Sequence, residues 1–185
     1  DRVRHDFGGD PDIIIHCNDQ NVGNLQSVNN GIELANGDIV ANIDDDAAAA
    51  PDWIEKLVEA YEDEDALAAG GRIEPNWVDG EAEYIPEEFY WLIGATHRGF
   101  QEEPGEVRNT FGSNLSFRRD IVEELGGYPT AEEGRNARFQ AGETELCARL
   151  YYEYGRGVYY VPDAVVYHKI FEYRTKPKWL LERAS

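Results

Sequence analysis

The chain has 185 residues, 42% hydrophobic and 12% aromatic, which suits one domain with a real hydrophobic core and excludes a mainly disordered chain. No apolar run approaches the roughly 18 residues of a membrane-spanning helix, and no secretory signal sequence is visible. Acids outnumber Lys plus Arg by 37 to 17, and the formal net charge of -20 repels nucleic acid phosphates, so no nucleic-acid partner is expected.

The same charge predicts a protein adapted to high salt. Repulsion among so many carboxylates destabilises a compact fold in dilute buffer. At about 1 M salt the Debye length falls to roughly 3 Å, and the repulsion is screened. We therefore expect a halophilic protein, the alternative being an ordinary acidic one.

The first part of the chain alternates short apolar runs with amphipathic segments. β-Branched runs bounded by polar residues predict strands, and apolar residues at helical spacing predict helices. In chain order we expect a strand at 12–17, a helix at 21–37, a strand at 38–43, a helix from Pro51 and a strand at 66–73. This alternation is typical of an α/β domain with a largely parallel sheet.

The second part is less regular. Residues 75–110 have no clean period and are expected to form loops and short pieces around a site. Cys17 and Cys147 lie in apolar segments without CxxC spacing, so both are expected to be small buried residues. The remaining predicted elements are a strand at 111–117, helices at 118–127 and 143–155, strands within 158–168, and a basic, aromatic tail.

Three consecutive acids, Asp44, Asp45 and Asp46, follow the predicted 38–43 strand. A triplet is expected by chance in so acidic a chain, so its placement is the informative feature. Ligands of open α/β sheets bind at the carboxyl ends of strands. Crowded carboxylates need a cation, and Mg²⁺ prefers oxygen ligands together with substrate phosphates. The alternative is a solvated acidic turn.

Several segments resemble family 2 glycosyltransferases, which have the GT-A fold, and they occur in the family's order. The resemblance spans roughly residues 12–170. Within the family, the sequence most resembles haloarchaeal members that extend lipid-linked glycans for N-glycosylation, including hexuronic acid transferases. The matching segments are NVGNLQSVNNGIELANGDIVANIDDDAAAAPDW (21–53), GSNLSFRRDIVEELGGYP (112–129), GETELCARL (142–150) and YYVPDAVVYHK (159–169).

The resemblance assigns roles to individual residues and implies Mg²⁺ or Mn²⁺ as the cofactor. Asp46 falls at a metal ligand and His168 at a further metal or diphosphate contact, although a lone histidine on an apolar strand is also a common core residue. The expected donor-binding residues are Asp44, Asp45 and the turn Gly112, Ser113 and Asn114.

The catalytic base is expected at Glu143, with Glu145 as the alternative, because only one acid of the family's usual acidic pair is present in Gly142-Glu143. A base is needed to take the proton of the acceptor hydroxyl. Helical residues two apart point about 200° away from each other, so at most one of the two is expected to face the site. Both could instead be surface acids of an amphipathic helix.

Family members usually begin with a strand and helix that hold the nucleotide base, and neither is recognisable here. The predicted fold is therefore an α/β, GT-A-type (Rossmann-like), mostly parallel sheet flanked by helices, with its N-terminal strands missing. Residues 1–170 form the catalytic domain in this interpretation. Residues 171–185 form a tail whose bases and aromatics suit an anionic membrane surface, or simple packing.

The predicted function is inverting, metal-dependent sugar transfer from a nucleotide-diphosphate donor to a lipid-linked or glycan acceptor. The expected location is the cytoplasmic face of the cell membrane. Two alternatives stay open at this point: a sugar-nucleotide nucleotidyltransferase, and a non-catalytic nucleotide-sugar-binding module.

Overall fold

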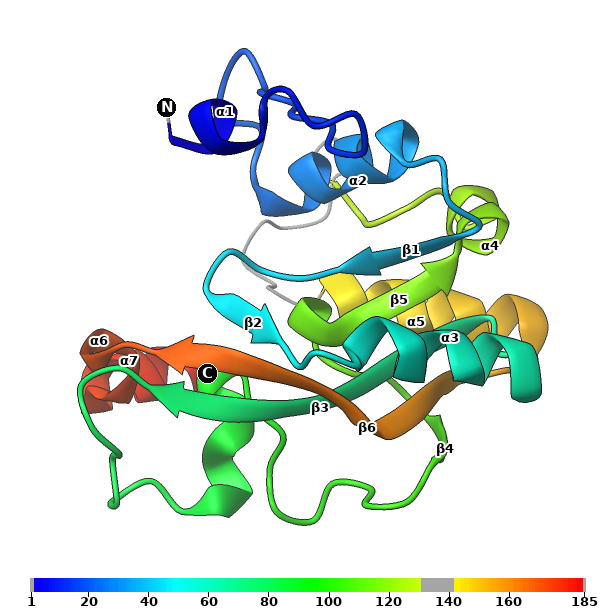
Figure 1. Ribbon diagram of the computed structural model, residues 1–185. Helices are drawn as coiled ribbons and strands as arrows, with labels where there is room; N and C mark the ends of the chain where they lie inside the picture. The colour runs from blue at the N-terminus through cyan, green and yellow to red at the C-terminus, as the bar shows by residue number, and fades with distance from the viewer. Residues whose placement is uncertain (1, 131–141, 185) are drawn as a thin grey trace.

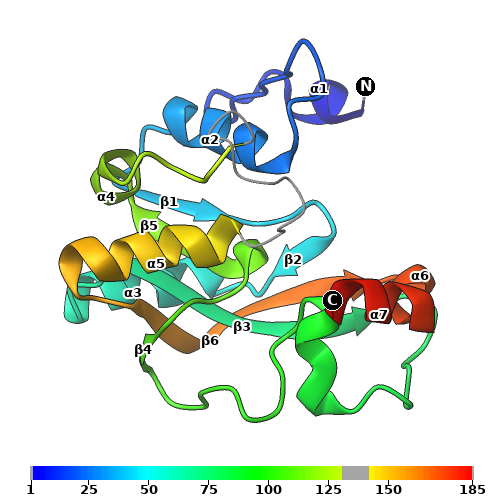
Figure 2. The same ribbon diagram turned by 180° about the vertical axis from the view of Figure 1, so that it is seen from behind.

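The computed structural model describes residues 2–130 and 142–184. A six-stranded sheet runs in the order β1-β5-β3-β6-β2, and β4 pairs with β6 beside this path. Helix α3 covers one face of the sheet and α5 the other (Figures 1 and 2). The strands are β1 (Ile39–Asn42), β2 (Ala47–Ala49), β3 (Ala68–Trp77), β4 (Gly105–Val107), β5 (Leu115–Arg118) and β6 (Val158–Ile170).

The predicted helices are present; α5 is shifted by one residue from the predicted 143–155, and the others are shorter than expected. The second helix ends at Leu34 instead of near Gly37. The α-helices are α1 (Arg2–Phe7), α2 (Asn24–Leu34), α3 (Trp53–Asp63), α4 (Arg119–Glu124), α5 (Gly142–Tyr154), α6 (Glu172–Thr175) and α7 (Pro177–Ala184), and the 3-10 helices are η1 (Glu87–Ile93) and η2 (Gly112–Asn114).

The sheet is mixed, so the expectation of a mostly parallel sheet is wrong. Strands β3 and β6 run parallel. Strand β5 lies between β1 and β3 and is antiparallel to both, and β2 and β4 are each antiparallel to β6. A continuous buried run is typical of parallel strands, and β5 has such a run although both of its neighbours are antiparallel, because helices cover both faces of the sheet.

Strand β6 replaces the two strands expected within 158–168. Its register against β3 shifts between Gly71 and Ile73, so residues 162–165 fall in an irregularity of the ladder. Pro162, which has no N–H to donate, sits in this irregularity and therefore does not interrupt a regular pairing. A Cβ on Gly71 would lie 1.9 Å from the Ala164 carbonyl oxygen, so the close approach of the two strands requires glycine there.

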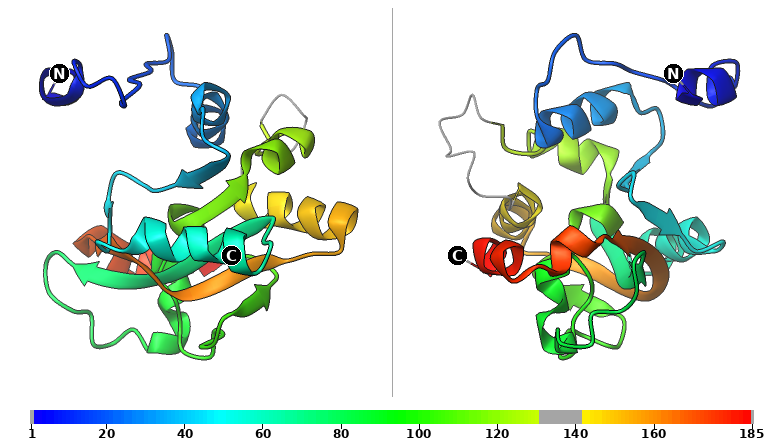
Figure 3. Two further views of the ribbon diagram at one scale, coloured as in Figure 1. Left: turned by 45° about the vertical axis from the view of Figure 1, so that its right-hand side comes forward. Right: turned by 90° about the vertical axis from the view of Figure 1, so that its left-hand side faces the viewer.

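The strand predicted at 12–17 is wrong. These residues belong to no helix or strand, and Ile13 and Ile14 are exposed. The segment lies with α1 apart from the sheet (Figure 3). A β-branched run becomes a strand only where a neighbouring strand receives its backbone hydrogen bonds. Cys17 is accordingly exposed, against expectation, whereas Cys147 is buried as expected.

Three clusters of buried side chains hold the fold together. One lies between the sheet and helices α4 and α5, with Leu146 and Leu150 at its centre. A second lies under α3 and contains Trp53 and Leu57. The third joins η1 to the ends of β3 and β6, and Trp179 of α7 packs against it.

The C-terminal tail is thus packed onto the body next to η1 (Figure 2). The Tyr84 hydroxyl donates to the Thr175 carbonyl oxygen over 2.6 Å and fixes the turn between α6 and α7. Over residues 2–130 and 142–184, no helix combines the length and apolarity needed to cross a bilayer.

Candidate functional site

The acidic triplet lies in the turn between β1 and β2. Asn42, at the end of β1, donates through its side chain to the Gly112 carbonyl oxygen over 2.7 Å, which ties the strand end to η2. Strand β2, absent from the sequence prediction, then pairs with β6 so that Ala47 lies opposite His168. The Lys169 amide donates to the Asp46 carbonyl oxygen over 2.8 Å. These contacts place Asp46 directly beside His168.

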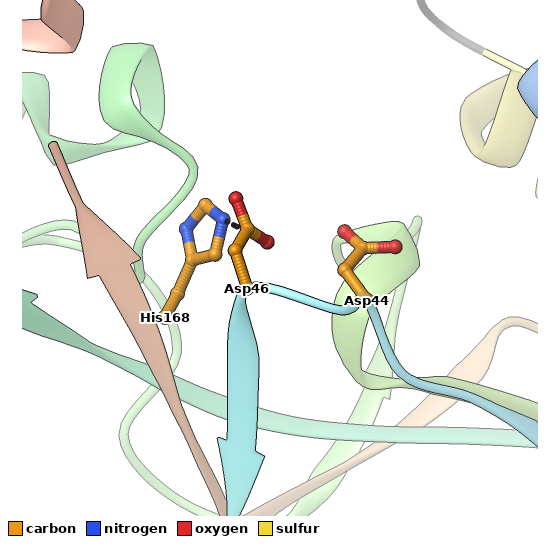
Figure 4. A group of neighbouring side chains, drawn as sticks. All are labelled: Asp44, Asp46 and His168. Carbon is orange, nitrogen blue, oxygen red and sulfur yellow. Dashed lines mark ion pairs between the residues drawn. The ribbon is translucent and has the colours of Figure 1, made fainter. Parts of the chain in front are cut away.

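Asp44, Asp46 and His168 form one group of potential metal ligands, each with a ligand atom within 4.8 Å of the others. All three side chains point to the same side of the turn (Figure 4). His168 Nε2 lies 3.3 Å from Asp46 Oδ1. Burial, followed by the neighbouring Asp46 carboxylate, raises the pKa of Asp44. Two carboxylates and an imidazole are a donor set that suits Mn²⁺, so the residues present fit the expected cofactor.

His168 lies in a tight, buried position. It is 4% exposed, and a Cβ on Gly94 would lie 3.0 Å from its Cε1 atom, so Gly94, with φ of 79°, leaves just enough room for the ring. Burial, followed by the charge of Arg174, lowers the pKa of His168. Nη1 of Arg174 lies 3.0 Å from Nε2. Because a guanidinium only donates, we assign Nε2 as the unprotonated ring nitrogen, with its lone pair directed toward Arg174.

Arg174 is a residue of the site that the sequence analysis missed. Besides His168, its guanidinium contacts Asp46, with Nη2 2.8 Å from Oδ2. The available signal was the cluster of bases in the tail of a strongly acidic chain, but residue spacing does not say which base folds back onto the triplet.

A cleft of about 1140 Å³ opens beside this group. Its volume is slightly above the range of about 300–1,000 Å³ that is usual for small-molecule sites, which leaves room for a ligand of nucleotide-sugar size. The walls come from the segment before α2, the end of β1, η1, η2, the start of α5 and the C-terminal tail. The lining residues include Asp44, Gly112, Ser113, Glu143, Arg174 and Arg183.

Glu143 lies at the first turn of α5 and lines the cleft. Gly142 allows this approach, because a Cβ there would lie 2.6 Å from Leu25 Cδ1. Burial is the main cause that raises the pKa of Glu143; its own backbone hydrogen bond and the charge of Arg183 act in the opposite direction, and Asp44 adds to the rise. A carboxylate with a raised pKa facing a cleft is a candidate proton acceptor.

Glu145 also lines the cleft, so the expectation that at most one of the two acids faces it is wrong. The cleft wraps around the N-terminal end of α5, which exposes both sides of its first turn. The two residues nevertheless differ in their partners. Glu145 binds Arg149, with Oε2 2.9 Å from Nη2, as expected for an i,i+4 pair. Arg149 also donates to the carbonyl oxygens of Leu125 and Gly127, so Glu145 supports the joint between α4 and α5.

The remaining expected site residues divide into two groups. Gly112 and Ser113 line the cleft. Asn114 is fully buried; its Nδ2 donates to the Arg72 and Ala164 carbonyl oxygens, and its Oδ1 accepts from Trp53 Nε1 over 2.8 Å. Asp45 is exposed and lines a second hollow between α2 and β1, away from His168. Asn114 and Asp45 are thus not among the residues lining the main cleft.

Helices on both faces of a mixed sheet, with an acid–acid–histidine group beside a large cleft, define the GT-A architecture of glycosyltransferases. The chain is similar to TarS of S. aureus in complex with UDP-GlcNAc, with a TM-score of 0.63 and 12% identity over 92% of this chain and 46% of that one. It is also similar to the mannosyltransferase PcManGT of Pyrobaculum calidifontis in complex with GDP-Man and Mn²⁺, with a TM-score of 0.59 and 21% identity over 88% and 40% of the two chains.

The chain belongs to glycosyl transferase family 2, whose family model matches residues 2–126. The resemblance found in the sequence is therefore confirmed. A curated relative, the glucosyl-dolichyl phosphate glucuronosyltransferase of Haloferax volcanii, is 52% identical over 187 aligned residues, which cover 100% of this chain. The chain spans 59% of the length of that relative.

Proposed function

We propose that this chain is the catalytic part of an inverting glycosyltransferase that moves a sugar from a nucleoside-diphosphate donor to a lipid-linked acceptor. The observation that carries the proposal is that Asp44 and His168 line the same cleft as Glu143, with Asp46 beside His168. One end of the cleft is suited to a diphosphate and a cation, and the other to the acceptor hydroxyl. The name of the Haloferax relative supports a glycosylated lipid phosphate as the acceptor.

At the diphosphate end, Asp46 and His168 would hold the divalent cation, and Asp44 would face the nucleotide. Gly112 and Ser113 form the adjoining wall. A cation bound there, Mg²⁺ or Mn²⁺, supplies positive charge that stabilises the departing nucleoside diphosphate.

At the acceptor end, Glu143 would take the proton of the acceptor hydroxyl as its oxygen attacks the anomeric carbon and the bond to the diphosphate breaks. Such a single displacement inverts the anomeric centre and needs one carboxylate, in contrast to the two required by hydrolytic glycosidases. Burial favours Glu143 for this role because it raises the pKa and hence the proton affinity of the carboxylate.

For the donor sugar, we propose a hexuronic acid. Arg183 of α7 lines the cleft and lies close enough to Glu143 to affect its pKa. None of the hydrogen bonds or ion pairs between described residues involves Arg183. A guanidinium in this position can bind a sugar carboxylate through two hydrogen bonds, and the Haloferax relative is a glucuronosyltransferase by name.

Residues 1–170 would form the catalytic domain and residues 171–185 a tail that completes the cleft and meets the membrane. Leu181 is 71% exposed on α7, the helix that also carries Lys178, whose side chain is 88% exposed. Apolar and basic side chains together suit the anionic cytoplasmic leaflet, where a lipid-linked acceptor would be presented.

The test is transfer from a labelled nucleotide sugar to a lipid-linked acceptor, with and without EDTA. EDTA-sensitive product formation is expected. Release of pyrophosphate from a nucleoside triphosphate and a sugar 1-phosphate would instead indicate a nucleotidyltransferase. Donor binding without turnover in the longest chain that contains these residues would indicate a binding module.

A further inference from the structure

The guanidinium of Arg174 lies between two of the side chains that would hold the cation. Nη2 is 2.8 Å from Asp46 Oδ2, and Nη1 is 3.0 Å from His168 Nε2. Because a guanidinium only donates, Nε2 offers its lone pair to Arg174, and a cation bound to Nε2 would need the same lone pair. At Asp46 the guanidinium contacts Oδ2, whereas Oδ1 faces Nε2 at 3.3 Å. A cation on His168 Nε2 and the contact between Arg174 and His168 are therefore mutually exclusive.

The bridge is enclosed and has specific support. The side chains of His168, Arg174 and Asp46 are 5%, 19% and 20% exposed. Arg174 Nε also donates to the Tyr173 hydroxyl over 3.0 Å. Gly94 leaves the space in which the ring and the guanidinium meet, since a Cβ there would lie 3.0 Å from the ring and 3.9 Å from Arg174 Nη1.

Other bases of the tail behave differently. Lys176 pairs with Glu172 and Lys178 with Glu182, each one turn away along the chain. Arg174 instead crosses to the turn before β2, 128 residues away in sequence. Helix α6, which carries Arg174, has only four residues. Few backbone hydrogen bonds therefore hold this helix in place, and a small shift of α6 would move the guanidinium.

We infer that Arg174 is an internal counter-cation of the site. A divalent cation would displace its guanidinium from Asp46 and His168, and the guanidinium would then bind the donor diphosphate. The inference rests on the proposed function, because it takes Asp46 and His168 as cation ligands. A cation that binds alone would have to break the contact between Arg174 and His168 Nε2. When a nucleoside diphosphate binds as well, the displaced guanidinium gains a new anionic partner in the same cleft. Cation and nucleoside diphosphate should therefore bind with positive, reciprocal coupling.

The first experiment measures Mn²⁺ binding without donor, by calorimetry and by electron paramagnetic resonance of free Mn²⁺. Arg174→Met should tighten Mn²⁺ about 10- to 100-fold, the range expected when a charge-assisted hydrogen-bonded competitor is removed. The matched control is Lys169→Gln, which removes one positive charge next to His168 from an exposed side chain that is not part of the bridge. Equal tightening in both variants would mean that general electrostatics, and not the bridge, sets the affinity.

The second experiment repeats the Mn²⁺ titration in the presence of UDP and of GDP. The wild type should bind Mn²⁺ at least about ten-fold more tightly with the matching nucleotide, within the usual range of coupling between sites. Arg174→Met should lose most of this gain. Arg174→Lys, which keeps the charge but not the two-pronged contact, should fall between them and covers the case in which the Met variant does not fold.

The outcomes separate this inference from the proposed function. Unchanged Mn²⁺ affinity and unchanged coupling in both Arg174 variants would overturn the counter-cation and leave the metal site intact. Absence of Mn²⁺ binding in the wild type and in every variant, with and without nucleotide, would overturn the metal site itself and with it the inference.

Discussion

Glu143→Gln isolates the proposed proton transfer with the smallest structural change. The amide keeps the shape of the side chain at the start of α5 but does not accept the acceptor's proton. Removal of a general base typically lowers the rate about 10²- to 10⁴-fold, which corresponds to roughly 3–5 kcal/mol in the activation free energy. Donor affinity should stay close to that of the wild type, because the base acts in the transition state.

The raised pKa of Glu143 gives the substitution two further signatures. Transfer needs the ionised carboxylate, so the acidic limb of the wild-type rate profile should lie above the ordinary glutamate value of 4.5 and disappear in the Gln variant. The folded protein also binds this proton more tightly than the unfolded chain does. Stability contributed by the group is therefore present at low pH and is lost as the pH rises through the raised value. At neutral pH, Glu143→Gln should keep or raise the melting temperature while transfer collapses.

The matched control is Glu145→Gln. Its pairing with Arg149 is partly exposed, so this variant should lose about 0.3–1 kcal/mol of stability and little transfer activity. The assay is acceptor-dependent turnover with a hydroxyl acceptor, because an already ionised acceptor would not need a base. An inactive Glu145→Gln beside an active Glu143→Gln would move the base by two residues. Near wild-type turnover in both variants would place the base elsewhere.

The other predictions concern the cation, the donor sugar and the salt dependence. Asp46→Ala should abolish Mn²⁺-dependent transfer, Asp44→Ala should chiefly weaken nucleoside diphosphate binding, and His168→Ala should weaken metal-dependent binding less; calorimetry that shows no change in any of them would refute the site. Arg183→Gln should reduce the preference for UDP-glucuronic acid over UDP-glucose about ten-fold or more in direct binding, in line with the loss of a charge-assisted pair, and an unchanged preference would exclude its carboxylate contact. Dialysis from about 2 M KCl to dilute buffer should unfold the protein by circular dichroism, and retention of the fold would contradict halophilic adaptation.

The sequence predicted those elements whose stabilising contacts are local or strongly patterned. The apolar stripe of α3 after Pro51 and the end of α4 at Gly126-Gly127 depend on residues within one or two turns. The order of the family motifs also brought Asp46 and His168 into one hypothesis although they are 122 positions apart in the sequence, and they lie side by side in the structure. The family and the GT-A fold that this order predicted are confirmed by the family model and by the structural similarity.

Tertiary structure decided the features that depend on a partner distant in the chain. The alanine-rich run at 47–49 has poor β-propensity and becomes β2 only because β6 pairs with it. Residues 12–17 have good propensity but no neighbouring strand, and they stay irregular. The direction of β5 could not be read from its sequence either: residues 115–117 are all buried, a pattern more typical of parallel strands, because helices cover both faces of this antiparallel strand.

The same distinction applies to the site. Residue type and motif position indicated that Glu143 or Glu145 is the base, but the pairing of Glu145 with Arg149 and the burial of Glu143 are properties of the folded chain. Arg174 is the clearest case. In the sequence, Arg174 is only one more base in a basic tail. In the folded chain, α6 brings its guanidinium to Asp46, in the turn before β2. Sequence patterns record which side chains are available and which faces they occupy; contacts between distant segments arise only when the whole chain packs, so only the structure assigned this residue to the site.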